Sequence, residues 1–179
     1  MLTARSRHDD LRKNHCLTSH PQHNITQSTT RMPGTYTSLH YHVIFSTKNR
    51  EPIIAAAWRA RLHEYLGGMI HGLGGTPLCV GGVADHVHLL FGLKPAHCLS
   101  DFMRDLKKDA TNWTKETLQQ PHFAWQEGYA AFTVSPTAIE SVRDYVNDQE
   151  EHHRVRTFRE ELMTMLRRAG VEFEERYLD

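Results

Sequence analysis

Residues 76–93, TPLCVGGVADHVHLLFGL, decide the fold of this chain. Short apolar runs broken by turn-forming residues predict two strands, 77–83 and 86–93, joined by a tight turn around Ala84 and Asp85. Strands joined so closely pair as an antiparallel hairpin. The rest of the sequence must supply the elements that pack against it.

A strand and a helix precede this hairpin. LHYHVIFST, residues 39–47, alternates its apolar side chains as a half-buried strand does. Apolar residues then recur at helical spacing over 58–73, and Gly74 with Gly75 supplies a stop signal.

Another helix, a fourth strand and two more helices follow the hairpin. Ser100 is a candidate N-cap for a helix that ends near Gln119, and GYAAFTVS, residues 128–135, predicts a strand. A serine followed by proline opens a helix that runs to about Gln149, and a last helix is expected over 158–169. The order predicts an α/β (α+β) fold, a ferredoxin-like β-α-β-β-α-β sandwich with additional C-terminal helices.

Length and composition indicate one ordinary soluble domain. The 179 residues predict a single domain over 35–179, with a C-terminal helical extension from about residue 155. Lys plus Arg and Asp plus Glu both total 21, which argues against general polyanion binding but leaves room for a local phosphate-binding face. The sequence has no apolar run of membrane-spanning length, no signal peptide and no cysteine framework, so we expect a reducing, cytoplasmic location.

The first 34 residues differ from the rest of the chain. They carry five Lys or Arg against two Asp and almost no large apolar side chains, which predicts a disordered basic leader. Two alternatives stay open: translation that begins at Met32, and a basic arm that touches nucleic acid.

The first chemical signal is the His-Val-His sequence in the second strand of the hairpin. Side chains two apart on a strand point the same way, so His86 and His88 present two imidazoles side by side. Such a pair suits a divalent metal that takes a third ligand from elsewhere. The alternative is two half-exposed histidines in a chain that has 14. Asp85 either orients an imidazole or only serves the turn.

The second signal lies in ESVRDYVNDQEEHH, residues 140–153. On a helix, Tyr145 and Gln149 would share a face, where a tyrosine hydroxyl can attack phosphorus and an amide oxygen can hold Mg²⁺ or Mn²⁺. A half-buried core tyrosine is the alternative. His152 and His153 are further imidazoles, most simply read as a solvated helix end, and Tyr129 is a competing nucleophile.

Five short blocks occur in an order that resembles a known family. They are YHVIFSTKNREP, ADHVHLLFGL, LSDFMRDLKKDA, WQEGYAAFTVS and VRDYVNDQEEHH. Together they resemble the single-tyrosine transposases of the insertion-sequence two-hundred type, which belong to the HUH nucleases and are related to the transposases associated with repetitive extragenic palindromes. The resemblance spans about residues 36–160.

The resemblance implies a function and a site. It implies a DNA transposase that cuts single-stranded DNA beside a hairpin, keeps the 5′ phosphate on tyrosine, releases a 3′ hydroxyl and needs no nucleotide cofactor. The family's nucleophile falls on Tyr145, and its metal ligands fall on His86, His88 and Gln149, for Mg²⁺ or Mn²⁺. It also implies a homodimer, in which one subunit's tyrosine can meet the other's histidines.

Local cations are the candidates for DNA contacts. Lys48 and Arg50 follow the first strand, and Arg104, Lys107 and Lys108 share a helix face that could lie along a phosphate backbone. The alternative is a solvated helix face. Phe123 and Trp125 would either stack on bases or belong to the core. A catalytically silent module that binds DNA or RNA hairpins is the alternative function.

Overall fold

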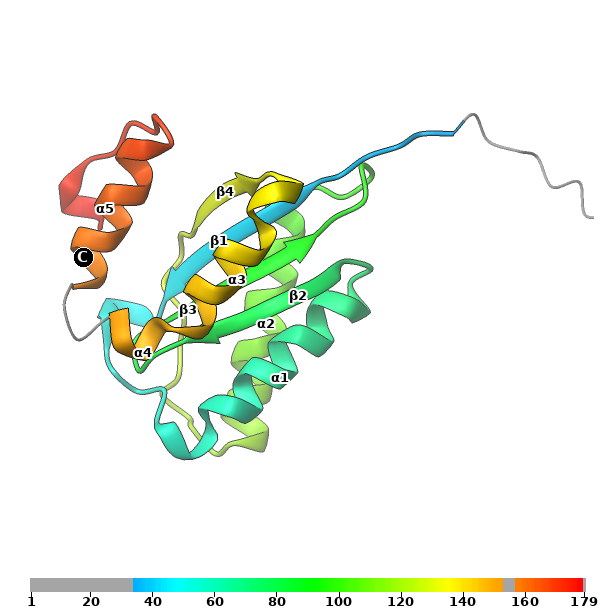
Figure 1. Ribbon diagram of the computed structural model, residues 1–179. Helices are drawn as coiled ribbons and strands as arrows, with labels where there is room; N and C mark the ends of the chain where they lie inside the picture. Colours follow the sequence, from blue (N-terminus) through cyan, green and yellow to red (C-terminus); the bar gives the residue numbers. More distant parts are fainter. Residues whose placement is uncertain (1–33, 153–156, 179) are drawn as a thin grey trace, which may run out of the picture. The chain divides into compact units, whose positions relative to one another are not determined.

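The computed structural model describes residues 34–152 and 157–178 and contains a four-stranded antiparallel sheet (Figure 1). The strands are β1 (His40–Ser46), β2 (Thr76–Gly82), β3 (His86–Gly92) and β4 (Ala130–Val134), in the order β2-β3-β1-β4. The helices are α1 (Ala56–Gly72), α2 (Leu99–Thr117), α3 (Ile139–Asn147), α4 (Gln149–His152) and α5 (Phe158–Arg168). Short 3-10 turns lie at η1 (Lys48–Arg50), η2 (Pro136–Ala138) and η3 (Glu175–Tyr177).

This order of elements confirms the predicted ferredoxin-like sandwich. β3 lies between β1 and β2 and is antiparallel to both, while β4 pairs with the other edge of β1. The predicted leader falls outside the described residues except for Gly34, so the domain boundary there stays a prediction. His153 and the side chain of His152 also lie outside them. Among the helices that are described, none is long and apolar enough to cross a membrane.

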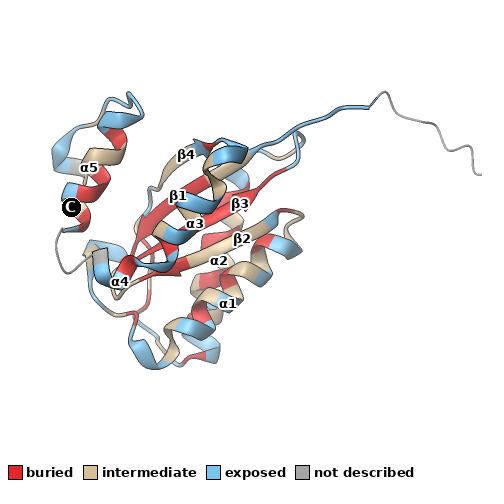
Figure 2. Ribbon diagram, in the orientation of Figure 1, coloured by how far each residue is buried: buried red, intermediate tan, exposed pale blue. Residues whose placement is uncertain are grey.

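The main core lies between one face of the sheet and the helices α1 and α2. Alternation along the central strands turns one set of apolar side chains toward these helices, and Figure 2 shows both strands largely buried. The residues that form this core from the two strands are Val43, Phe45, Val87, Leu89 and Phe91. They pack on Leu62, Leu66, Ile70, Phe102, Met103, Leu106 and Ala110.

Two details of the predicted helices are wrong. The helix assigned to Ser100 as N-cap begins two residues earlier, with Cys98 at the cap, because the amide of Phe102 bonds to the Cys98 carbonyl at 3.0 Å. The helix expected to run through Gln149 ends at Asn147, because Asp148 leaves the helical conformation at φ −92° and ψ 20°.

Helix α3 lies on the opposite face of the sheet (Figure 1) and approaches β2 closely at Gly81. A Cβ atom at position 81 would lie 2.2 Å from the carbonyl oxygen of Val146 and 2.9 Å from its Cγ1 atom. No side chain fits in that space, because real Cβ contacts are not this short. The glycine therefore sets how closely α3 sits on the sheet.

We predict that Gly81→Ala lowers the free energy of unfolding by about 1–3 kcal/mol, because the added methyl must push the α3 backbone away from β2. Urea denaturation measures the change. Gly68→Ala on α1 is the matched control, since nothing lies within 4 Å of its Cβ position, and it should not destabilise the protein. Equal stability of Gly81→Ala and the natural protein would contradict this packing.

His63 on α1 makes stability depend on pH. Burial, reinforced by the nearby charge of Arg59, lowers the pKa of His63 to about 4. Its Nε2 atom is buried and has no hydrogen-bond partner among the described residues. As the pH falls from 6.5 toward 4, the unfolded chain therefore takes up a proton that the folded chain does not, and the folded state loses stability.

The free energy of unfolding of the natural protein should fall between pH 7 and pH 4.5. In His63→Gln this fall should be smaller by on the order of 1–2 kcal/mol. Parallel denaturation curves at the two pH values measure it. His71→Gln, which changes an exposed histidine on the same helix, should keep the pH dependence of the natural protein. An unchanged pH dependence in His63→Gln would refute the assignment.

Candidate active site

His86 is held in one orientation by its neighbour in sequence. Its Nδ1 atom lies 2.7 Å from Oδ1 of Asp85, and since a carboxylate only accepts, Nδ1 carries the proton. Burial opposes ionisation of Asp85, but the hydrogen bond from His86 and the charge of Arg50 outweigh it and hold the pKa of Asp85 below its usual value. The buried Nε2 atom of His86 then carries the lone pair that a cation would need.

His88 is held by a histidine on the neighbouring strand. Its Nδ1 atom lies 3.0 Å from Nε2 of His42, and the two rings stack with centroids 5.2 Å apart. Burial lowers the pKa of His42 to about 4, so near pH 7 this ring is neutral and can accept the proton of His88 Nδ1. The Nε2 atom of His88, also buried, is again the nitrogen for a cation. Both histidines thus share the orientation expected of metal ligands.

Tyr145 lies beside these imidazoles in the same chain. Its ring meets His88 edge-on at 5.7 Å between centroids and His42 at 6.0 Å. The hydroxyl oxygen is buried, whereas the ring lines a groove of about 700 Å³ together with His42, Phe132 and Met165. The contact of Val146 with Gly81 fixes the helix that carries this tyrosine. Residues from β1, β3 and α3 therefore meet at one place.

Gln149 is the first residue of α4 and is 1% exposed. Its side-chain nitrogen donates to the backbone carbonyl of Tyr145 at 3.0 Å, which ties it to the tyrosine despite the break at Asp148. The amide oxygen is the atom of this side chain that could bind a cation. Its role as a metal ligand stays a prediction.

Glu161 on α5 also reaches the histidines, which sequence reasoning missed. Three atoms lie within 4.8 Å of one another: a carboxylate oxygen of Glu161, a ring nitrogen of His86 and a ring nitrogen of His88. Burial, with the charge of Asp85 second, raises the pKa of Glu161 to about 7. Two imidazoles and a carboxylate are donors that suit a divalent ion. An acidic residue on the apolar side of the helix, next to Leu162, was the signal in the sequence.

Arg50 borders this site from the turn after β1. Its guanidinium lies 3.7 Å from Asp85 and stands 4.8 Å above the ring of Phe158, which itself packs 4.2 Å from the ring of His86. Asn49 and Arg50 both have positive φ values, 55° and 54°, which side-chain-bearing residues rarely adopt. Lys48 beside them is exposed.

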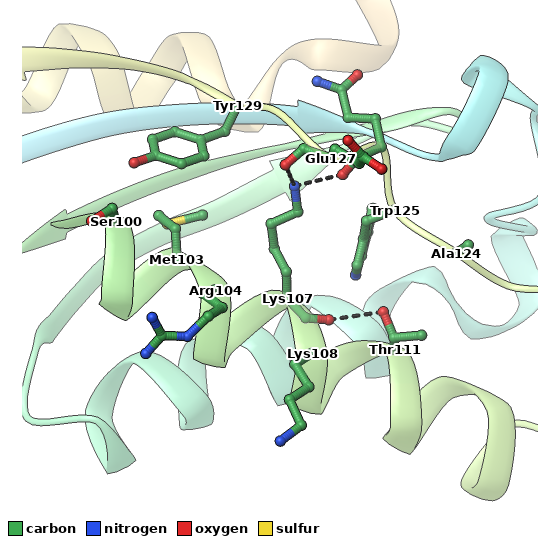
Figure 3. A pocket seen from close by; sticks show the side chains of 11 residues that line it. Ser100, Met103, Arg104, Lys107, Lys108, Thr111, Ala124, Trp125, Glu127 and Tyr129 are labelled. Atoms are coloured by element: carbon green, nitrogen blue, oxygen red, sulfur yellow. Dashed lines mark hydrogen bonds between the residues drawn. The ribbon is translucent and has the colours of Figure 1, made fainter.

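The cations of α2 do not act as one group. Lys107 is 9% exposed, and its ammonium donates to the carbonyls of Gln126, Glu127 and Gly128 at 2.6, 2.9 and 2.8 Å. Figure 3 shows it pointing toward this segment, while Lys108 points the opposite way. All three donors of Lys107 are used within the protein, so the expectation of a face shared with its neighbours is wrong.

Arg104 and Lys108 are both exposed. Arg104 pairs with Asp101 at 2.5 Å and Asp105 at 3.1 Å. These acids partly neutralise the helix face that was expected to meet phosphates.

The aromatic residues before β4 belong to the core of the α1 and α2 side. Phe123 and Trp125 are buried and pack edge-to-face at 4.7 Å, so they are not platforms for bases. Tyr129 packs on the same core, and burial raises its pKa. It is also near Ser100 and Met103 in the hollow of Figure 3, on the opposite side of the sheet from the three histidines.

Comparison with known proteins gives a family. No curated protein matches the chain. Among solved structures, a candidate transposase from Deinococcus radiodurans R1 is 27% identical, covers 65% of this chain and 95% of that chain, and has a TM-score of 0.52. A REP-associated tyrosine transposase bound to a REP hairpin is 13% identical, covers 63% of this chain and 70% of that chain, and has a TM-score of 0.47. The family model described as "Transposase IS200 like" matches residues 35–149, so the chain belongs to the IS200-like transposases, a family of DNA-cleaving enzymes.

Proposed function

We propose that this transposase nicks and rejoins single-stranded DNA with Tyr145 as its nucleophile. The observation that carries the proposal is the position of the Tyr145 ring against His88 and His42 within one chain. Tyr129, the competing tyrosine, packs on the core of the other face and has no such surroundings. Among the tyrosines that the structure describes, Tyr145 is therefore the one that lies beside the oriented imidazoles.

The chemistry is a transfer of a phosphoryl group between two oxygens. Oη of Tyr145 attacks the phosphorus of a DNA phosphodiester, and the bond from phosphorus to the 3′ oxygen breaks. The phenol loses its proton and the leaving oxygen gains one, giving a 5′-phosphotyrosine and a free 3′ hydroxyl. The number of phosphoester bonds is unchanged, so a 3′ hydroxyl can reverse the step and rejoin strands without a nucleotide cofactor.

A divalent ion, Mg²⁺ or Mn²⁺, fits this site. His86 and His88 would hold it through their Nε2 atoms, with the amide oxygen of Gln149 as a further ligand. When bound, such an ion offsets the charge of the phosphate that the phenol approaches. The chain's own contribution is to fix the imidazoles, since Asp85 and His42 each hold one Nδ1 atom.

DNA would reach this site past the cations nearest to it. Arg50, beside Asp85 and Phe158, and the exposed Lys48 flank the histidines through the turn after β1. Arg104 and Lys108 on α2 remain candidates for a more distant contact, and Lys107 is left out because its ammonium is used internally. Hairpin-flanked sites and a homodimer are part of the proposal, although one chain supplies all the residues above.

We predict that Tyr145→Phe abolishes covalent attachment of the protein to a 3′-labelled hairpin oligonucleotide, because the attacking oxygen is gone, and the 3′ label stays on the strand that the tyrosine would hold. Denaturing electrophoresis after incubation with Mg²⁺ or Mn²⁺ measures the adduct. Tyr129→Phe is the matched control and should form it at the level of the natural protein. An adduct that persists in Tyr145→Phe would refute the nucleophile, and hairpin binding with no adduct in the natural protein would favour a catalytically silent module.

We predict that His86→Ala lowers cleavage by at least about 100-fold, while hairpin affinity stays within about threefold, because a metal ligand is lost but no DNA contact is. Gel-shift assays measure the hairpin affinity and cleavage assays measure the rate on the same oligonucleotide. Chelation of metal from the natural protein should likewise lower cleavage while leaving hairpin affinity nearly unchanged. His71→Ala, an exposed change on α1, is the control. Equal losses of binding and cleavage would mean that His86 has a structural role.

A further inference from the structure

We infer that Glu161 is a ligand of the divalent ion, so that helix α5 completes the metal site from outside the family-matched residues. The inference rests on the proposed metal role of His86 and His88. One carboxylate oxygen of Glu161 lies within 4.8 Å of ring nitrogens of both histidines, a spacing that one ion can bridge. The family match ends at residue 149, so this ligand belongs to the C-terminal part of this chain.

The packing of α5 selects Glu161 as the residue that faces the histidines. Phe158, Leu162 and Leu166 form a buried cluster with Ile44 of β1, and Phe158 also packs on the ring of His86. Glu161 lies on this buried side of the helix and is 9% exposed.

The neighbouring residue Glu160 has a structural role instead. Glu160 caps the start of α5, where the Glu160 amide donates to Thr157 Oγ1 at 3.3 Å and the Thr157 amide donates to the Glu160 carboxylate at 3.0 Å. The two consecutive glutamates are thus separated in function. One stabilises the helix end, and the other carries its charge into the site.

A carboxylate contributes a negative charge to a cation site, which imidazole and amide ligands do not. His86 and His88 bind an ion as neutral imidazoles and Gln149 as a neutral amide, so Glu161 is the group of this set that lowers the charge of a bound divalent ion from +2 to +1. Six-coordinate ions have room for all of these donors and for phosphate oxygens, so Glu161 need not displace Gln149.

The donor set also favours one class of ion. Imidazole nitrogens suit first-row transition metals, whereas Mg²⁺ prefers oxygen ligands and keeps several waters. Two imidazoles with one carboxylate should therefore bind Mn²⁺ more tightly than Mg²⁺. The carboxylate adds a negatively charged oxygen, which strengthens the site for both ions.

Calorimetric titration of the full chain with MnCl₂, without DNA, tests the ligand directly. We expect Glu161→Gln to weaken Mn²⁺ binding by at least about tenfold, since it keeps the size of the side chain but removes its charge. Glu172→Gln removes an exposed glutamate beyond α5 and should bind Mn²⁺ as the natural protein does. Unchanged Mn²⁺ affinity in Glu161→Gln would overturn the inference.

Two further measurements separate the possible failures. Mn²⁺ should raise the melting temperature of Glu161→Gln less than that of the natural protein, because the variant binds the ion more weakly. If Glu161→Gln binds Mn²⁺ normally and His88→Ala does not, Glu161 is no ligand while the proposed metal site stands. If both bind Mn²⁺ normally, the metal site of the proposed function fails as well.

Discussion

The hydrogen bond between His42 and His88 joins the two central strands on the face of the sheet that carries the candidate site. This contact depends on how β1 and β3 pair. β1 and β3 pair so that Ile44 lies opposite His88, which leaves His42 as the diagonal neighbour of His88. If this register shifted by one residue, the imidazoles would face α1 and α2. The apolar side chains that now pack on these helices would move to the opposite face of the sheet. The buried core therefore enforces the position of the histidines.

The position of Tyr145, the proposed nucleophile, depends on a second constraint, the lack of a side chain at Gly81. Because α3 rests directly on β2 there, Val146 is fixed and the preceding residue, Tyr145, meets the edges of the His42 and His88 rings. Gly81 also lies opposite His88 in the sheet. One short stretch of β2 and β3 thus positions both the proposed nucleophile and a proposed metal ligand.

The sequence predicted what depends on local periodicity. The alternation in 86–91 placed His86 and His88 on one face, and the expected strands and helices lie within a few residues of their observed bounds. It could not predict contacts between residues distant in sequence. The use of Lys107 on three carbonyls near residue 127 and the approach of Glu161 to the histidines arise only when separate elements pack. The break at Asp148 was missed because nothing in its local sequence forbids a continuous helix.

The central claim is that one chain carries a complete site, with Tyr145 beside its own histidines. Co-expression of two differently tagged chains, one Tyr145→Phe and the other His86→Ala, tests it most directly. Each chain then lacks one essential group, so a mixture assayed for covalent attachment to a hairpin oligonucleotide should yield no adduct on either chain, while co-expressed natural chains do. A covalent adduct on the His86→Ala chain would mean that its tyrosine works with the histidines of the other subunit, and would contradict the account.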